Sequence, residues 1–266
     1  MKTLADLLLR APDESTRRDM EVLLTAALGV QRAYLYAHGD EPLTIPGAAQ
    51  LERMLADYHR GTPVAYLIGR REFWKLLLEV SRDVLIPRPE TELLVELVLL
   101  RLRPRARVLD LGTGSGAIAL AIKQERNDCA VTATDISTAA IETARRNAST
   151  YGLDLIFRVG SWYSVAEDSY DLIVSNPPYI AETDPHLEAL VSEPRIALSA
   201  GSDGLDALRI VVSGAPGHLT RGGWLLVEHG HDQGVAVRGL FEAAGLDAIE
   251  THQDLAGLDR VTLGKR

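Results

Sequence analysis

The order of strand-like and helix-like segments beyond Pro104 constrains the fold of this 266-residue chain more than any other feature. Five short runs rich in aliphatic residues alternate with helical stretches, at residues 107–111, 130–135, 155–159, 170–175 and 223–228. Repeated strand–helix units indicate a mainly parallel sheet covered by helices on both faces. Two further runs, near 248–252 and 260–263, follow one another without a helix, so we expect an antiparallel pair at one edge. The chain is therefore predicted to have an α/β fold.

The first 70 residues follow a different pattern. Apolar residues recur there at helical spacing, as at positions 4, 7 and 8 and again at 51, 54, 55 and 58. Turn residues divide this part into four or five short helices, which predicts a small helical bundle. Residues 72–84 suit a β-hairpin or an extended connector, and Pro87 and Pro89 exclude a helix before Pro89.

Composition excludes several classes of protein. The formal charge of -9 weighs against a protein whose main task is to grip nucleic acid, because phosphate binding needs a basic face. Cys129 is the only cysteine, so no internal disulfide or cysteine-rich metal site can form, and the histidines show no ligand spacing. The start of the chain lacks a signal-peptide pattern, and no uncharged apolar run reaches the length of a membrane span. We expect a soluble, cytoplasmic protein without a metal.

A glycine-rich turn follows the first strand of the predicted sheet, in Asp110-Leu-Gly-Thr-Gly-Ser-Gly116. In a doubly wound sheet, ligands bind where strands end and helices begin. Gly112, Gly114 and Gly116 can adopt positive φ and let backbone amides approach a bound molecule. Dinucleotide enzymes use a similar turn, but their pattern is G-x-G-x-x-G, whereas this one is G-x-G-x-G.

Two residues further on are candidates for the same ligand. Asp135 ends the second strand, where its carboxylate can accept hydrogen bonds from both hydroxyls of a ribose, of adenosylmethionine or of NAD. It could instead cap the following helix. Trp162 follows the third strand and either flanks an adenine ring or lies in the core. Asp110 is expected to orient the glycine turn or to meet the ligand's ammonium group.

The tetrapeptide Asn176-Pro-Pro-Tyr179 ends the fourth strand, on the same predicted edge. Consecutive prolines cannot continue a strand ladder and make the backbone rigid. In that setting the side-chain oxygen of Asn176 and the carbonyl of Pro177 can both accept hydrogen bonds from one NH2 group. Tyr179 can stack on a planar amide or base. A rigid turn with a capping asparagine is the alternative, but it does not explain why both halves of a site share one edge.

This arrangement predicts methyl transfer to a planar nitrogen. An amide nitrogen is a poor nucleophile because its lone pair is delocalised into the carbonyl, and two acceptors for its hydrogens help to localise that pair. Adenosylmethionine carries a sulfonium leaving group, so in-line transfer needs positioning more than a strong base.

The residues resemble the PrmC/HemK glutamine methyltransferases, which modify peptide-chain release factors. The resemblance covers most of the chain and rests on these segments: Pro63-Val-Ala-Tyr-Leu67, Arg71-Glu-Phe-Trp74, Ile86-Pro-Arg-Pro-Glu-Thr-Glu92, Asp110 to Leu120, Val174-Ser-Asn-Pro-Pro-Tyr-Ile180, Glu228-His-Gly230 and Arg260-Val-Thr-Leu-Gly264.

The resemblance implies three segments and a full set of site residues. Residues 1–71 would be a helical bundle that docks the substrate, 72–89 a β-hairpin and proline linker, and 90–266 a seven-stranded Rossmann-like class I methyltransferase domain. S-adenosyl-L-methionine, leaving as S-adenosylhomocysteine, would contact Gly112, Thr113, Gly114, Ser115, Gly116, Asp135, Trp162 and Asn176. The glutamine of the Gly-Gly-Gln loop of class 1 release factors would meet Asn176, Pro177, Pro178 and Tyr179, with Asn176, Pro177 and Tyr179 as the catalytic set.

The chain departs from the family pattern at two places. Ser161 stands where the family usually has an acidic residue before the aromatic one, which removes a carboxylate contact to the adenine amino group. The segment between Leu187 and Glu193 is shorter than in the family, which would alter the loop over the substrate.

Three other functions fit parts of the pattern. An adenine-amino methyltransferase acting on DNA or RNA would use the same tetrapeptide to hold an exocyclic amine and stack a flipped base. The missing basic surface and the lack of a target-recognition domain count against it. A non-catalytic module that docks translation proteins is the second alternative, and an NAD enzyme is the third. The preferred hypothesis is a monomeric release factor methyltransferase that contacts neither nucleic acid nor a membrane.

Overall fold

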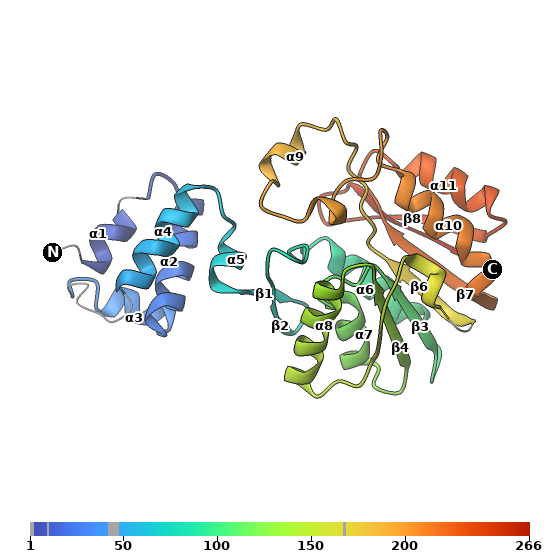
Figure 1. Cartoon of the computed structure of the whole chain (residues 1–266), viewed down its shortest axis with the longest axis horizontal. Coiled ribbons are helices and arrows are strands. Elements are labelled where there is room, and N and C mark those ends of the chain that lie inside the picture. Colours follow the sequence, from blue (N-terminus) through green and yellow to red (C-terminus); the bar gives the residue numbers. More distant parts are fainter. Residues whose placement is uncertain (1–2, 10, 42–47, 167–168) are drawn as a thin grey trace. The chain divides into compact units, whose positions relative to one another are not determined.

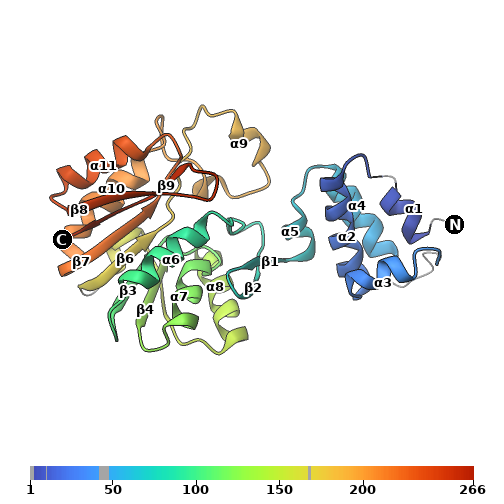
Figure 2. The same cartoon turned by 180° about the vertical axis from the view of Figure 1, so that it is seen from behind.

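The computed structural model describes residues 3–9, 11–41, 48–166 and 169–266 of the chain. It consists of two compact units, residues 1–70 and 71–266 (Figures 1 and 2). Each unit has its own core.

The first unit is helical, as its apolar spacing predicts. Within its described residues the helices are α1 Leu4–Leu9, α2 Glu14–Leu28, α3 Arg32–Ala37, α4 Ala48–His59 and α5 Val64–Ile68. Asp13 begins α2, because its side chain accepts a hydrogen bond of 2.8 Å from the backbone N–H of Thr16. Gly29 ends α2 in the left-handed region, with φ 66°. Buried Leu4, Leu24 and Leu35 belong to the core that joins the helices.

A two-stranded hairpin opens the second unit. Its strands are β1 Arg70–Phe73 and β2 Leu76–Glu79. Helix side chains hold its backbone: Trp74 N donates to Glu92 (2.7 Å), and Glu79 N donates to Asn147 (2.7 Å). The indole N–H of Trp74 donates to Glu125 at 2.8 Å. These bonds fix the hairpin against three helices of the same unit.

A seven-stranded sheet forms the centre of the second unit, as predicted, in the order β5-β4-β3-β6-β7-β9-β8. The strands are β3 Arg107–Leu111, β4 Ala130–Asp135, β5 Ile156–Val159, β6 Tyr170–Ser175, β7 Leu219–Glu228, β8 Asp247–Gln253 and β9 Asp259–Lys265. The first five are parallel, and β9 runs antiparallel to both β7 and β8. The predicted antiparallel pair at one edge is therefore confirmed.

Helices cover both faces of this sheet (Figures 1 and 2). They are α6 Thr91–Arg101, α7 Ala117–Glu125, α8 Thr138–Tyr151, α10 Asp206–His218 and α11 Gly234–Ala243. Successive residues of β3 point to opposite faces: Val108 packs in the core formed with α6 and α7, whereas Leu109 and Leu111 pack in the core formed with α10 and α11. The connection between β6 and α10 contains α9 His186–Ala189.

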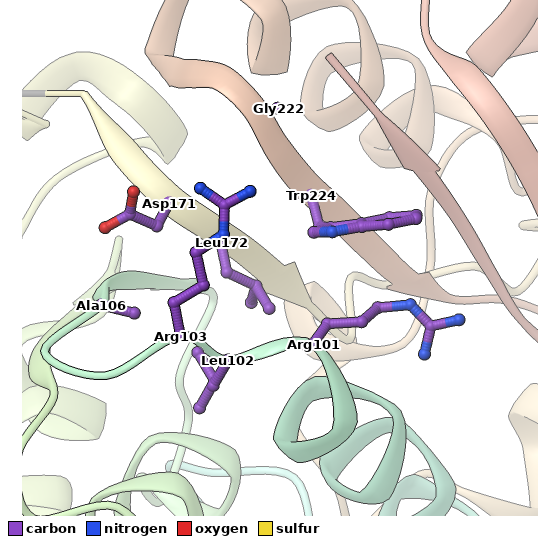
Figure 3. A pocket seen from close by; sticks show the side chains of 8 residues that line it. All are labelled: Arg101, Leu102, Arg103, Ala106, Asp171, Leu172, Gly222 and Trp224. Atoms are coloured by element: carbon purple, nitrogen blue, oxygen red, sulfur yellow. The ribbon is translucent and has the colours of Figure 1, made fainter.

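A small hollow lies near the amino ends of β3 and β6, and Figure 3 shows Arg103, Asp171 and Trp224 around it. Its volume is about 10 Å³, which is room for one water molecule and not for a cofactor. In the described part of the chain, no helix is both long and apolar enough to cross a membrane.

Phe241 of α11 provides a test of this packing. Its side chain is fully buried, and Gly264 of β9 leaves it room, because a Cβ atom there would lie 2.7 Å from the ring. Phe241→Ala should lower the free energy of unfolding of the second unit by about 3–5 kcal/mol. Urea unfolding followed by tryptophan fluorescence measures this unit alone, because all three tryptophans, at 74, 162 and 224, belong to it. Leu255→Ala, at a fully exposed position, is the matched control and should change the free energy by less than about 0.5 kcal/mol.

Candidate active site

A cavity of about 380 Å³ opens where four parallel strands of the second unit end. Its wall includes residues at or just after the ends of β3, β4, β5 and β6, namely Gly112 and Gly114, Asp135 to Ser137, Gly160 to Trp162, and Asn176 with Pro178. The volume lies in the range of small-molecule sites, and the position is the one that doubly wound sheets use for ligands.

The glycine-rich turn is held by backbone bonds from β4. Gly112 N and Thr113 N both donate to the Thr134 carbonyl at 2.9 Å, and Gly114 N donates to Asp135 Oδ2 at 2.9 Å. Gly112 and Gly114 have φ of 74° and 56°, in the left-handed region that favours glycine. The turn therefore reaches the cavity with backbone atoms and no side chains.

The remaining turn residues face the protein. Thr113 donates to buried Asp110 at 2.6 Å, and the Ser115 carbonyl accepts from Asn147 at 2.9 Å. A Cβ on Gly116 would lie 3.1 Å from that of Ala144, so Gly116 permits close packing of α7 on α8. None of the three lines the cavity. Asp110 is fully buried, burial raises its pKa to about 7, and it accepts the hydrogen bond from the Thr113 hydroxyl.

Asp135 lies on the cavity wall with both carboxylate oxygens in use. Oδ2 accepts from Gly114 N, and Oδ1 accepts from Ser137 N at 2.9 Å. Burial raises the pKa of Asp135. Ser137, and not Asp135, caps α8, through the bond from Ala140 N to its hydroxyl. Each carboxylate oxygen retains a second lone pair for a ligand hydroxyl.

Trp162 belongs to both the cavity wall and the core. Its ring lies 3.8 Å from where a Cβ on Gly112 would be, and it packs against the core beside α10. Its backbone has φ 47°, which is unusual for a residue with a side chain. Ser161 also lines the cavity, so a hydroxyl occupies this place instead of an acidic group.

The tetrapeptide divides between the cavity and the interior. Asn176 and Pro178 line the cavity, and the side-chain Nδ2 of Asn176 donates to the Thr91 hydroxyl at 3.1 Å. Tyr179 packs against the core beside α10, and its hydroxyl donates to Glu228 Oε1 at 3.3 Å. Burial raises the pKa of Tyr179 above its usual range, so it remains a neutral phenol. Pro177 does not line the cavity, and no hydrogen bond among the described residues uses its carbonyl oxygen.

The chain between β6 and α10 forms the opposite wall, with Pro194, Ile196, Ala197 and residues 199–201. A β-bridge joins Ile180, near the start of this excursion from the sheet, to Ser199, near its end. The bridge brings the chain back to the sheet edge. Glu193 joins it to the segment after the hairpin, accepting from Ile86 N (3.1 Å) and from the Arg88 guanidinium. These contacts hold the excursion against the proline-rich segment.

Two site residues were not assigned roles from the sequence: Thr91 and Glu228. Both are buried, at 4% and 1% exposure, and connect to the tetrapeptide. Burial raises the pKa of Glu228 to about 7, while the Thr91 hydroxyl, Arg260 and Tyr179 lower it. The sequence signal that could have identified them is their position in segments 86–92 and 228–230, which carry the family resemblance. No group of three or more His, Cys, Asp or Glu residues in the described ranges could hold a metal ion.

Together, the glycine turn after β3, the acid that ends β4, the tetrapeptide after β6 and the antiparallel sheet edge define a class I methyltransferase domain. Family models agree: Methyltransferase small domain matches residues 89–203, and PrmC N-terminal domain matches residues 1–69. The release factor glutamine methyltransferase of Xylella fastidiosa strain Temecula1 is 55% identical, over 97% of this chain and 96% of that protein. The Yersinia pestis protein of the same name is 47% identical, over 95% and 93%. The chain belongs to the family of release factor glutamine methyltransferases.

Solved structures show the same fold at low sequence identity. A methyltransferase from Pyrococcus furiosus matches with a TM-score of 0.58 and 18% identity, covering 80% of this chain and 98% of that chain. The 16S rRNA N2 G1207 methyltransferase of Thermus thermophilus, solved with AdoMet and guanosine, matches with a TM-score of 0.55 and 19% identity, covering 74% and 49%.

The raised pKa of Glu228 predicts a pH-dependent stability difference. Its usual value of 4.5 becomes about 7 in the folded chain, so the folded protein retains the proton that the unfolded chain loses. The stabilisation from this group is complete below pH 4.5 and is lost as pH rises through 7. The glutamine in Glu228→Gln cannot ionise, so this variant does not lose that stabilisation as the pH rises. The free energy of unfolding of the variant minus that of the parent should therefore increase by about 2 kcal/mol between pH 5 and 8.

Urea titrations of both proteins across that range measure the difference. Asp110 has a similar pKa, and the lowered pKa of His229 acts in the opposite direction. Both proteins contain these two groups, so their contributions to the pH dependence cancel in the difference. A difference that does not change with pH would show that Glu228 is already ionised at pH 5.

Proposed function

We propose that this protein transfers a methyl group from S-adenosyl-L-methionine to the side-chain amide nitrogen of the glutamine in the Gly-Gly-Gln motif of class 1 peptide chain release factors. Family membership supports the reaction and the substrate. One contact carries the chemical assignment. Asn176 lines the cavity and donates through Nδ2 to Thr91, so the Oδ1 atom of Asn176 is left to accept a hydrogen bond from a substrate.

The cavity fits the proposed methyl donor. Backbone atoms of Gly112 and Gly114, the Asp135 carboxylate and the Trp162 ring surround one space of suitable volume. Asp135 would accept from the ribose hydroxyls, Trp162 would flank the adenine, and Thr113, Ser115 and Gly116 would keep the turn in shape from behind. Ser161 would offer the adenine amino group a neutral hydroxyl. The bound donor supplies a methyl group on a positively charged sulfur and leaves as S-adenosylhomocysteine.

The substrate amide would be held by two acceptors. Asn176 Oδ1 and the Pro177 carbonyl would each accept one hydrogen of the glutamine NH2 group, which directs the nitrogen lone pair toward the methyl group. The rigid Pro177-Pro178 backbone keeps these acceptors in place. Tyr179, neutral and tied to Glu228, would stack on the amide plane.

The balance of the reaction is simple. One carbon–sulfur bond breaks, one carbon–nitrogen bond forms, and the amide nitrogen loses one proton. The amide oxygen of Asn176 and the carbonyl oxygen of Pro177 are too weakly basic to remove that proton before methyl transfer. They would stay hydrogen-bonded to it until the methylated nitrogen bears a positive charge, and the nitrogen would then release the proton to water. Positioning and electrostatic stabilisation are then the contributions of this chain.

The proposal includes the arrangement of the whole protein. Residues 1–71 would dock the release factor, 72–89 would form the linker, and 90–266 would carry the reaction. The enzyme would act as a monomer in the cytoplasm, with no nucleic acid, metal or membrane.

A methylation assay decides between the proposed substrate and an adenine base. The protein is incubated with labelled S-adenosyl-L-methionine and either a class 1 release factor or an adenine-containing oligonucleotide. Mass spectrometry should find one added methyl on the Gly-Gly-Gln glutamine, and a Gly-Gly-Asn release factor variant should remain unmodified. Labelling of the oligonucleotide alone would contradict the proposal.

Asn176→Ala should separate donor binding from transfer. Removing one of two acceptors should lower kcat roughly 100-fold, while the Kd for S-adenosyl-L-methionine changes by less than about 10-fold. Calorimetry gives the Kd, and single-turnover mass spectrometry gives the rate. Unchanged turnover would show that Asn176 does not hold the substrate amide.

A further inference from the structure

One buried asparagine connects the hairpin to the glycine-rich turn. Asn147 of α8 is 2% exposed, and its Oδ1 atom accepts a hydrogen bond of 2.7 Å from the backbone N–H of Glu79, at the end of β2. Its Nδ2 atom donates to the Glu79 carbonyl at 3.0 Å and to the Ser115 carbonyl at 2.9 Å. A single side chain therefore joins the second strand of the hairpin to the turn that follows β3.

The partners of Asn147 explain why this position needs an asparagine. All three are backbone groups, so their polarity is fixed: one N–H can only donate, and two carbonyls can only accept. A short amide side chain offers one acceptor oxygen and two N–H donors, which matches this set. An ionised aspartate has the same shape but no donor, and a leucine has neither kind of group. The orientation of the Asn147 amide is thus set by the backbone around it.

A second side chain of α8 holds the same edge of the hairpin. The Tyr151 hydroxyl accepts from the Leu77 N–H at 2.6 Å and donates to the Leu77 carbonyl at 3.0 Å. Residues 77 and 79 direct their backbone groups to one edge of β2, about 7 Å apart, and residues 147 and 151 lie one turn apart on α8, about 6 Å. This match of spacings lets the helix bind the strand edge (Figure 1). Of the described contacts made by these two side chains, only those of Asn147 include the turn.

The Ser115 carbonyl is the point at which Asn147 acts on the turn. Bonds from β4 hold residues 112–114, whereas the bond from Asn147 holds the peptide group that joins Ser115 to Gly116. A peptide group is planar, so fixing its carbonyl also fixes the N–H of Gly116, which donates to the Thr113 carbonyl at 2.8 Å. Gly114, which lines the cavity, lies between these two anchored parts of the turn.

Resting on the proposed function, we infer that Asn147 is a positioning residue for the methyl donor: it anchors the glycine turn to the hairpin and so keeps the turn in the shape that binds S-adenosyl-L-methionine. Asn147 does not line the cavity, so it acts on the donor only through the turn. The hairpin begins directly after residues 1–69 in the chain. The donor site therefore depends on the segment through which the chain leaves the helical bundle.

Asn147→Leu removes all three bonds and keeps a side chain of similar size. The Kd for S-adenosyl-L-methionine, measured by calorimetry, should rise about 10-fold, which is the effect expected for the loss of one good buried hydrogen bond. KM for the donor should rise by a similar factor. The kcat at saturating donor and KM for the release factor should stay within about threefold of the parent, because the residues that would hold the substrate are unchanged.

Tyr151→Phe is the matched control. It removes both bonds to Leu77 and loosens the hairpin from the same helix, but it leaves the bond between Asn147 and Ser115 intact. Urea unfolding should show lower stability in both variants, whereas the donor Kd of Tyr151→Phe should change by less than about twofold. A purely structural role for Asn147 would instead give both variants the same donor affinity.

Amide hydrogen exchange in the unsubstituted protein tests the same link without depending on how a variant folds. Adding S-adenosyl-L-methionine should slow exchange of the Glu79 N–H by about threefold or more, because the donor stabilises the turn to which Asn147 is bonded. Glu79 does not line the cavity, so direct shielding by the donor does not explain such a change. The Leu77 N–H, bonded to Tyr151, is the internal reference and should change by less than about twofold.

The outcomes separate this inference from the proposed function. A parent protein that leaves the release factor unmodified contradicts the proposed function. A parent that methylates it, together with an Asn147→Leu variant of unchanged donor Kd, shows that Asn147 does not position the turn. Equal losses of donor affinity in Asn147→Leu and Tyr151→Phe, or equal slowing of exchange at Glu79 and Leu77, would also overturn the inference. If Asn147→Leu does not fold, the exchange measurement decides alone.

Discussion

The parallel register of three central strands is the constraint on which the site depends. Leu111 of β3 pairs with Thr134 of β4 and with Ser175 of β6, so these three residues lie level across the sheet. The Ser175 hydroxyl reinforces the pairing by donating to the Leu111 carbonyl at 2.7 Å. The next residue of each strand is Gly112, Asp135 or Asn176. A shift of one strand by a single residue would turn its group to the other face of the sheet.

The sheet and its turns could be predicted because their signals are local. Short aliphatic runs, glycines at fixed spacing and paired prolines act within a few residues, and the seven strands and the positions of Gly112, Asp135 and Asn176 follow from them. Which turn residues reach the cavity could not be predicted. The Thr113 hydroxyl bonds buried Asp110, and the Ser115 carbonyl accepts from Asn147, and such contacts depend on packing.

Thr91 and Glu228 show the same limit more clearly. A threonine at a helix start and a glutamate at a strand end are common surface residues. Their burial arises only when α6 and β7 pack together beside the tetrapeptide, and residues 91 and 176 are 85 positions apart in the chain. Resemblance identified the segments that contain them, but their hydrogen bonds to Asn176 and Tyr179 could be found only from the coordinates.

The backbone of Trp162 limits which residues can form this wall of the cavity. A φ of 47° is disfavoured for any residue with a Cβ, and a glycine would adopt it with less strain. Glycine, however, would remove the ring that packs over Gly112 and against the core beside α10. The polypeptide therefore tolerates a strained peptide unit in exchange for a flat, rigid surface, and replacements that relax the main chain would leave this side of the cavity open.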